Sequence, residues 1–237
     1  MASKKKPSNG TRGSRGPHRK SGPDPAGLFA HDRGLGASSV AGADEAGRGC
    51  LAGPIVAAGV ILDRHCIEGF GDGLLGDLND SKKMTAASRE RLYPVIMRCA
   101  SRICVVMRSS RYIDANGLHV SNIEILGRAL SGLAADRETV CLVDGFFLPD
   151  CGVAHRKLIK GDSKSAAVAA ASVIAKVTRD RYMIRAGLLY PEYGFEGHKG
   201  YASDEHREAI REKGPTPIHR LSFDSAAYGD WRDSEAA

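Results

Sequence analysis

The stretch ADEAGRGCLAGPIVAAGVIL, residues 43–62, places two acidic side chains directly before a glycine-rich loop and a long apolar run. Asp44 and Glu45 end one apolar segment, and the β-branched residues of the following run are typical of a second strand. The short glycine-rich segment at 47–49 indicates a hairpin between the two strands. The sequence therefore predicts two carboxylates and an arginine held between glycines at one end of a sheet.

Further apolar runs extend this sheet along the chain. Five strands are predicted, at about 38–44, 54–62, 102–108, 139–144 and 156–160. Helices are predicted at about 85–99 with Pro94 inside, at 120–135, from 162 to Gly187, and from 203 to 214. The order of these elements favours an α/β fold, in which a five-stranded mixed sheet is flanked by helices and followed by a C-terminal helical extension.

The basic surplus of the chain lies in its first residues. The 237 residues carry a net charge of +6, and 42% of them are hydrophobic, which is enough for one sizeable core. Residues 1–25 hold seven basic residues and one acid, so the rest of the chain is electrically balanced. We expect residues 1–37 to form a disordered basic tail that either attracts nucleic acid or solubilises the protein. No apolar section follows its positive charges, so it is not interpreted as a secretion signal.

Cysteine spacing and hydropathy favour the cytoplasm. The six cysteines form no CxxC pair, and several lie inside apolar runs, as Cys104 and Cys141 do. They are interpreted as small buried side chains in a reducing compartment. No apolar run reaches the ~20 residues of a membrane helix, so no membrane association is expected.

Two more acids follow predicted strands. Asp144 ends CLVDGF, and Asp162 follows KLIKG just before the alanine-rich helix. If these strand ends share one sheet edge with Asp44 and Glu45, the four carboxylates converge and require divalent cations such as Mg²⁺. Two such ions about 4 Å apart can activate a water and stabilise the leaving oxygen of a phosphodiester. Taken singly, each acid is a common turn residue, or a helix N-cap at Asp162, but the set of four favours a metal site.

A second motif gives a different indication. Ser172 and Lys176 are similar to the S-x-x-K of penicillin-recognising acyl enzymes, although three residues rather than two separate them. The companion motifs S-D-N and K-T-G are absent, and both residues lie inside the predicted alanine-rich helix. We therefore interpret this match as chance.

The segments that carry these features resemble the ribonuclease HII family over residues 38–223. The matching segments are GADEAGRGCLAGPIVAAGVIL, LNDSKKMT, LVDGF, KGDSKSAAVAAASVIAKVTRDRYM, HKGYAS and GPTPIHRLSF. The resemblance implies an RNase H-like catalytic domain at 38–223, followed by a C-terminal tail at 224–237. It also implies metal-dependent cleavage of the RNA strand in RNA–DNA hybrids, and cleavage on the 5′ side of single ribonucleotides in duplex DNA, leaving a 3′-hydroxyl and a 5′-phosphate.

The resemblance also assigns roles to individual residues. It makes Asp44, Glu45, Asp144 and Asp162 the catalytic ligands of Mg²⁺ or Mn²⁺, with two ions when substrate is bound. It makes Gly47, Arg48 and Gly49 the loop that contacts the ribonucleotide, and it makes Tyr201 the ring that stacks on the next deoxyribose. Glycines suit this role because their backbone can approach a sugar closely, and the 2′-hydroxyl is what distinguishes RNA from DNA.

Other polar residues near these motifs have weaker indications. Lys82 and Lys164 are candidates for contacts with the substrate backbone, although lysines are most often simply solvated. His198 and His219 stay outside the catalytic set, because a loop histidine more often makes a structural hydrogen bond. We expect a monomer.

Two other functions fit part of the pattern. One is a general DNA nuclease or resolvase of the same superfamily, against which the glycine–arginine–glycine loop and Tyr201 argue. The other is a non-catalytic nucleic-acid clamp that uses the basic tail. The four acids argue against a clamp, because added negative charge weakens phosphate binding unless a metal is present.

Overall fold

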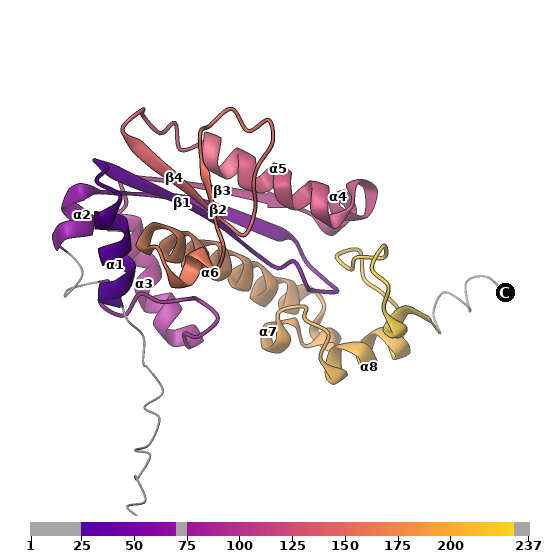
Figure 1. Cartoon of the computed structure of the whole chain (residues 1–237). Coiled ribbons are helices and arrows are strands. Elements are labelled where there is room, and N and C mark those ends of the chain that lie inside the picture. The colour runs from indigo at the N-terminus through magenta and orange to yellow at the C-terminus, as the bar shows by residue number, and fades with distance from the viewer. Residues whose placement is uncertain (1–24, 70–74, 230–237) are drawn as a thin grey trace, which may run out of the picture.

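The computed structural model describes residues 25–69 and 75–229, which form a five-stranded mixed sheet with helices on both faces (Figure 1). The strands are β1 Ser39–Ala46, β2 Ile55–Asp63, β3 Arg102–Arg108, β4 Thr139–Asp144 and β5 Arg156–Leu158. Their order across the sheet is β3-β2-β1-β4-β5. The first three strands pair antiparallel, whereas β4 is parallel to both β1 and β5. The predicted mixed sheet is confirmed.

Helices cover the two faces of this sheet. The α6 helix, Ala166–Leu189, packs on one face against β1 and β2, and the α5 helix, Leu118–Ser131, packs on the other. The remaining helices are α1 Pro25–Gly34, α2 Arg64–Gly69, α3 Ala86–Cys99, α4 Ser110–Asn116, α7 Phe195–His198 and α8 Asp204–Lys213. The described residues also form the short 3₁₀ helices η1 Gly161–Ser163, η2 Pro191–Tyr193 and η3 Ala226–Tyr228. As expected, α7 and α8 form a helical extension after α6 (Figure 1).

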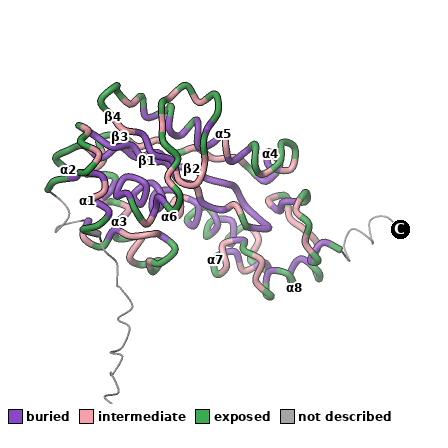
Figure 2. Tube along the Cα trace, viewed as in Figure 1, coloured by how far each residue is buried: buried purple, intermediate pink, exposed green. Residues whose placement is uncertain are grey.

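Strand alternation divides the core in two. Val40 and Ala46 of β1 face α6, whereas Ala41 and Ala43 face α5, because successive side chains of a strand point to opposite faces. The buried residues follow the sheet and the long α6 helix (Figure 2). A Cβ at Gly42 would overlap the backbone of α6, so this glycine allows the helix to lie directly on β1.

The folded region extends beyond both boundaries expected from the sequence. Residues 25–34, expected in the disordered tail, form α1, where Phe29 is fully buried. The carboxylate of Asp32 accepts hydrogen bonds of 3.0 Å from the Ser165 hydroxyl and the Ala167 amide, so α1 caps the start of α6. At the other end, Tyr228 of η3 is buried rather than part of a tail. The rest of the expected tails, 1–24 and 230–237, lies outside the described residues.

Two helix boundaries also differ from expectation. The long helix begins at Ala166 rather than directly after Asp162, because Ser165 is its N-cap and accepts a bond from the amide of Val168. It continues past Gly187 to Leu189. Within 25–69 and 75–229, no helix has both the length and the apolar character needed to cross a membrane.

Candidate active site

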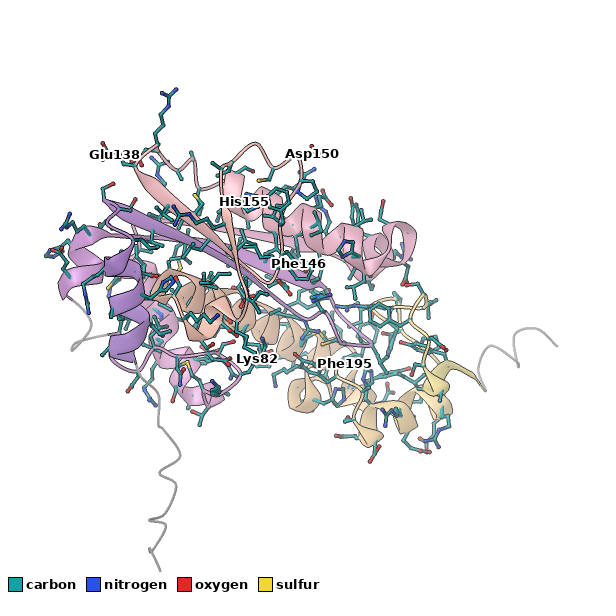
Figure 3. All side chains as sticks on the ribbon, viewed as in Figure 1. Lys82, Glu138, Phe146, Asp150, His155 and Phe195 are labelled. Atoms are coloured by element: carbon teal, nitrogen blue, oxygen red, sulfur yellow. The ribbon has the colours of Figure 1, made fainter. Side chains whose placement is uncertain are left out.

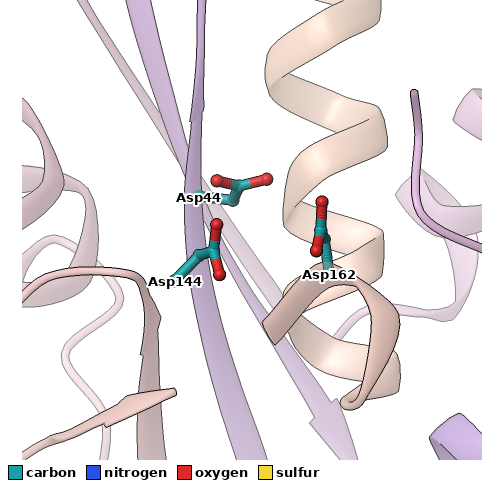
Figure 4. A group of neighbouring side chains, drawn as sticks. All are labelled: Asp44, Asp144 and Asp162. Carbon is teal, nitrogen blue, oxygen red and sulfur yellow. The ribbon is translucent and has the colours of Figure 1, made fainter. Parts of the chain in front are cut away.

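Three aspartates meet at one edge of the sheet. Because β1 and β4 are parallel, with Ala43 opposite Val143, Asp44 and Asp144 occupy neighbouring strand ends. Asp162 reaches the same place from η1, which follows β5. Each aspartate offers one carboxylate oxygen, and these oxygens lie within 4.8 Å of one another (Figure 4).

Short hydrogen bonds fix this arrangement. Asp144 Oδ1 accepts a 2.6 Å bond from the backbone amide of Gly161, which ties the end of β4 to the turn that carries Asp162. Asp44 Oδ1 accepts a 2.7 Å bond from the amide of Glu45. These bonds leave further carboxylate oxygens available for a ligand.

The raised pKa values of these carboxyl groups allow them to release protons when a cation binds. Burial raises the pKa of Asp44 well above its usual range, and the charges of Glu45 and Asp144 raise it further. Burial and the charge of Asp80 likewise raise the pKa of Asp162. Oδ2 of Asp44 and Oε2 of Glu45 are buried and have no hydrogen-bond partner in the described part of the chain. An oxygen-only donor set with unpartnered buried oxygens fits a hard divalent cation.

Glu45 lies beside this group rather than within it. Since it follows Asp44 on β1, its side chain leaves the opposite face of the strand. Its Oε1 lies 3.8 Å from Nη1 of Arg48. Burial raises the pKa of Glu45 to about 7, the positive charge of Arg48 lowers it, and the charge of Asp144 raises it again. The structure thus brings three of the four predicted acids into one group and places the fourth next to them.

The glycine-rich loop lines a cleft of about 240 Å³ beside the acids. Its walls are formed by Glu45, Ala46, Gly47, Arg48, Gly49, Ser81, Lys82, Lys176 and Tyr201. Gly47 has a φ of +95°, and a Cβ there would overlap the side chain of Arg179. The backbone of the loop therefore faces the cleft in a conformation that other residues rarely adopt.

Two buried arginines, not anticipated from the sequence, support this loop from beneath. Arg179 donates to the carbonyls of Pro54 (2.9 Å), Ala52 (3.0 Å) and Lys199 (2.9 Å). Arg179 is fully buried and makes no ion pair with a carboxylate among the residues described. The sequence could have indicated Arg179, because it lies among residues of α6 that are otherwise mostly apolar and buried. A buried charged side chain requires specific partners.

The second of these arginines, Arg220, contacts the loop at Arg48 and the segment after it at Gly53. Its guanidinium donates to the carbonyl of Gly53 at 3.0 and 2.9 Å and to that of Arg48 at 2.9 Å. Arg220 is fully buried, and burial lowers its pKa to about 10. The loop is therefore rigidly supported before any substrate arrives.

The predicted lysines occupy different environments. Lys82 Nζ donates to Oδ2 of Asp162 at 3.3 Å, although its side chain is 73% exposed. Lys164 is exposed and does not line the cleft. Lys176, which the sequence suggested only through a chance motif, does line the cleft, and its Nζ lies 5.2 Å from the centre of the Tyr201 ring. The Tyr201 residue is 41% exposed.

Ser172, the other residue of that motif, also lies at the site. It is buried and lowers the pKa of Asp44 through a hydrogen bond, and its Oγ lies 2.7 Å from Oγ of Ser81. Ser172 thus connects the aspartate group to the segment that carries Lys82. It is a supporting residue of the acidic site rather than the nucleophile of an acyl enzyme.

Phe146 supports the arginine of the loop. The guanidinium carbon of Arg48 lies 4.8 Å from the centre of the Phe146 ring, within the range of a cation–π contact. Figure 3 shows Phe146 on the α5 side of the sheet and Lys82 on the α6 side. Because Phe146 lies two residues after Asp144, the same turn holds a candidate metal ligand and orients Arg48.

The two histidines noted in the sequence make structural hydrogen bonds. His198 Nε2 lies 2.6 Å from the carbonyl of Tyr193, and His219 Nδ1 accepts from the amide of Thr216 at 2.8 Å. Both belong to the turns around Tyr201 and Ala52 rather than to the aspartate group.

Known proteins are similar to this chain in sequence and in fold. The family profile described as Ribonuclease HII matches residues 41–226. A Ribonuclease HII of Salinispora tropica is 48% identical over 204 residues, which cover 85% of this chain and 73% of the relative. A Ribonuclease HII of Brucella suis is 47% identical over 190 residues, covering 79% of this chain and 83% of the relative.

A solved structure shows the same relationship in three dimensions. The crystal structure of the ribonuclease H2 from Pyrococcus horikoshii OT3 superposes with a TM-score of 0.66 at 29% sequence identity. The match covers 83% of this chain and 99% of that one. With the profile match over most of its folded part and the acid-lined edge of its sheet, the chain belongs to the ribonuclease HII family, the type 2 ribonucleases H.

Proposed function

We propose that this type 2 ribonuclease H is a divalent-metal-dependent endonuclease that cuts the RNA strand of RNA–DNA hybrids. It also cuts on the 5′ side of a single ribonucleotide embedded in duplex DNA, leaving a 3′-hydroxyl and a 5′-phosphate. The observation that carries the proposal is the group of three aspartates whose oxygens lie within 4.8 Å of one another beside a cleft lined by glycine backbone.

The acids are suited to hold Mg²⁺ or Mn²⁺, with two ions when substrate is bound. Asp44, Asp144 and Asp162 would be the principal ligands, and Glu45, which follows Asp44 on β1, would complete the set. A bound ion supplies Lewis-acid activation of a water and neutralises charge on the leaving oxygen. The raised pKa values of Asp44 and Glu45 mean that binding of a cation displaces protons from these carboxyl groups.

The loop at 47–49 would select the ribonucleotide. Its backbone groups can reach a 2′-hydroxyl, because the glycines at its two ends carry no side chain to hold the sugar away. Arg48, held over Phe146, would contact a phosphate with its forked guanidinium. Arg179 and Arg220 keep the loop in one conformation, so less ordering is required when substrate binds.

Tyr201 would contact the sugar that follows the ribonucleotide. Its partly exposed ring lines the cleft, where it can stack on a deoxyribose, which lacks the 2′-hydroxyl. Lys82 and Lys176 also line the cleft and would neutralise phosphates near the scissile bond, and Lys164 would act from outside the cleft. We further infer that the enzyme acts in the cytoplasm, because all six of its cysteines are unpaired. A monomer is the oligomeric state we propose.

The decisive assay uses a DNA duplex that contains one ribonucleotide, with an all-DNA duplex of the same sequence as control. Cleavage of the first duplex alone, in Mg²⁺ and not in EDTA, with a 3′-hydroxyl on the upstream product, is the expected result. Equal cleavage of both duplexes would instead indicate a general DNA nuclease. Tight binding that is unchanged in EDTA, without turnover, would indicate a nucleic-acid clamp.

A further inference from the structure

Three histidines lie next to the turn that carries Tyr201. His198 ends α7, His206 lies in α8, and His219 follows α8 in the segment that pairs with Ala52. The rings of His198 and His206 stack at 4.4 Å, and Nε2 of His206 lies 3.0 Å from Nε2 of His219. Both members of this Nε2–Nε2 pair are almost completely buried.

The neighbours of the pair determine where each ring carries its proton. Nδ1 of His206 lies 2.9 Å from the carbonyl oxygen of Tyr201, which can only accept, so this nitrogen bears the hydrogen. Nδ1 of His219 accepts a 2.8 Å bond from the amide of Thr216, so the hydrogen of His219 is on Nε2. The Nε2–H of His219 therefore donates to the bare Nε2 of His206, and one proton connects two neutral rings.

The surroundings keep these rings neutral. Phe195 lies edge-on against His206, with ring centres 5.4 Å apart (Phe195 is labelled in Figure 3). Burial lowers the pKa of His206 to about 4 and that of His219 to about 3. At neutral pH the chain from Thr216 through both histidines to Tyr201 is thus fully satisfied.

His198 holds the other side of the same turn. Its Nε2 donates to the carbonyl of Tyr193 at 2.6 Å, and its Nδ1 accepts from the amide of Gly200 at 3.1 Å. The turn between these bonds pairs Tyr201 with Cys50, directly after the glycine-rich loop. Histidine side chains thus fix the backbone before and after the Tyr201 side chain.

We propose that His206, with its tautomer set by His219, is a positioning residue that fixes the Tyr201 carbonyl and thereby the pose of the Tyr201 ring in the cleft. This inference rests on the proposed role of Tyr201 in contacting the sugar after the ribonucleotide. The histidine touches no substrate itself. Its loss should therefore weaken binding of a duplex with one ribonucleotide more than it slows the chemical step.

Two substitutions at position 206 distinguish the roles of Nδ1 and Nε2 of the His206 ring. In His206→Asn the side-chain amide can place a donor where Nδ1 stands. In His206→Gln it reaches toward His219, so the Tyr201 carbonyl loses its side-chain donor and keeps only the 2.8 Å bond from the Ser203 amide. We expect His206→Gln to raise KM about tenfold on the one-ribonucleotide duplex, the effect of one lost hydrogen bond, with little change in kcat. We expect His206→Asn to stay within about threefold of the wild type.

The same pair of substitutions in a Tyr201→Ala background provides the matched control. If the histidine acts through the tyrosine, the difference between Asn and Gln disappears there. Equal behaviour of Asn and Gln in the parent, or a difference that persists without the Tyr201 ring, overturns the proposal. Circular dichroism and thermal unfolding establish that the compared variants are folded.

A spectroscopic measurement tests the proton positions even where a variant does not fold. Nitrogen NMR of ¹⁵N-histidine in the wild-type protein at pH 7 should show His206 protonated on Nδ1 and His219 on Nε2. The opposite tautomers, or a charged ring, would contradict the assignment. If the wild type does not cut the one-ribonucleotide duplex, the proposed function has failed, whereas the tautomers still report on the positioning chain.

Discussion

Replacing Asp144 by asparagine removes one charge from the aspartate group while keeping its shape. The asparagine carbonyl can still accept the 2.6 Å bond from the Gly161 amide, so the connection between β4 and η1 is retained. The lost charge is one of those that raise the pKa of Asp44, Glu45 and Asp162. The substitution therefore separates the role of the carboxylate in folding from its role in holding a cation.

The two effects have opposite signs. The oxygens of the group lie within 4.8 Å of one another, and two unit charges at that distance repel by roughly 3.5 kcal/mol at an effective dielectric constant of about 20. This is an upper value, because the raised pKa of Asp44 keeps part of the group protonated. Without metal, Asp144→Asn should therefore be as stable as the wild type or up to about 2 kcal/mol more stable. Cleavage should fall about 1,000-fold, the effect of losing about 4 kcal/mol of transition-state stabilisation.

Two measurements on the same preparation check this expectation. Urea unfolding in EDTA at pH 8 gives the change in stability, and single-turnover cleavage of a one-ribonucleotide duplex in Mg²⁺ gives the change in rate. Asp150→Asn is the matched control, because Asp150 is an exposed residue of the same β4–β5 connection and should leave both quantities unchanged. Cleavage within tenfold of the wild type, or a variant destabilised by more than about 1 kcal/mol, would show that the carboxylate is structural.

Four further substitutions give distinct outcomes. Burial raises the pKa of Glu45 from 4.5 to about 7, so the folded state binds this proton more tightly than the unfolded state does. As the pH rises from about 4.5 to about 7, the free energy of unfolding of the metal-free wild type should therefore fall by on the order of 3 kcal/mol relative to that of Glu45→Gln. Urea unfolding across this pH range measures the difference, and a constant difference would be inconsistent with a buried Glu45 carboxyl. Gly47→Ala should lower stability by about 1–3 kcal/mol, because φ is +95° and the new methyl overlaps Arg179. Gly49→Ala meets nothing within 4 Å, so it should fold normally yet cleave poorly, and full activity of this variant would exclude close contact between the loop backbone and the sugar. Arg220→Lys should cost about 2–3 kcal/mol, or roughly 5–10 °C in melting temperature, because buried carbonyls of the loop lose their donors; an unchanged melting temperature would show that these bonds do not support the loop.

The sheet and the meeting of the aspartates followed from local pattern. The β-branched runs predicted all five strands, and the position of Asp44 and Asp144 at the ends of β1 and β4 predicted that they would be neighbours. The different placement of Glu45 was also implicit in the sequence, because adjacent residues of a strand face opposite sides. Because the four acids were grouped only by their position at strand ends, the opposite facing of Asp44 and Glu45 was not taken into account.

The features that were not predicted depend on contacts between distant segments. The α1 helix is stabilised by burial of Phe29 and by the bond from Ser165 to Asp32, partners 133 residues apart. The cap of α6 is Ser165 rather than Asp162, because Asp162 belongs to the separate turn η1. The two arginines beneath the loop become visible only when α6 and the C-terminal segment are placed against residues 47–54, since no local pattern shows which carbonyls they reach.

Binding of Mn²⁺ to the substrate-free protein tests the aspartate site most directly. Isothermal titration calorimetry at pH 6.5, in two buffers of different ionisation enthalpy, should show binding with release of protons, because the pKa values of Asp44, Glu45 and Asp162 are raised. The variant with asparagine at positions 44, 144 and 162 should not bind. Equal binding by this variant, or no binding by the wild type at millimolar Mn²⁺, would show that the three aspartates do not form a metal site.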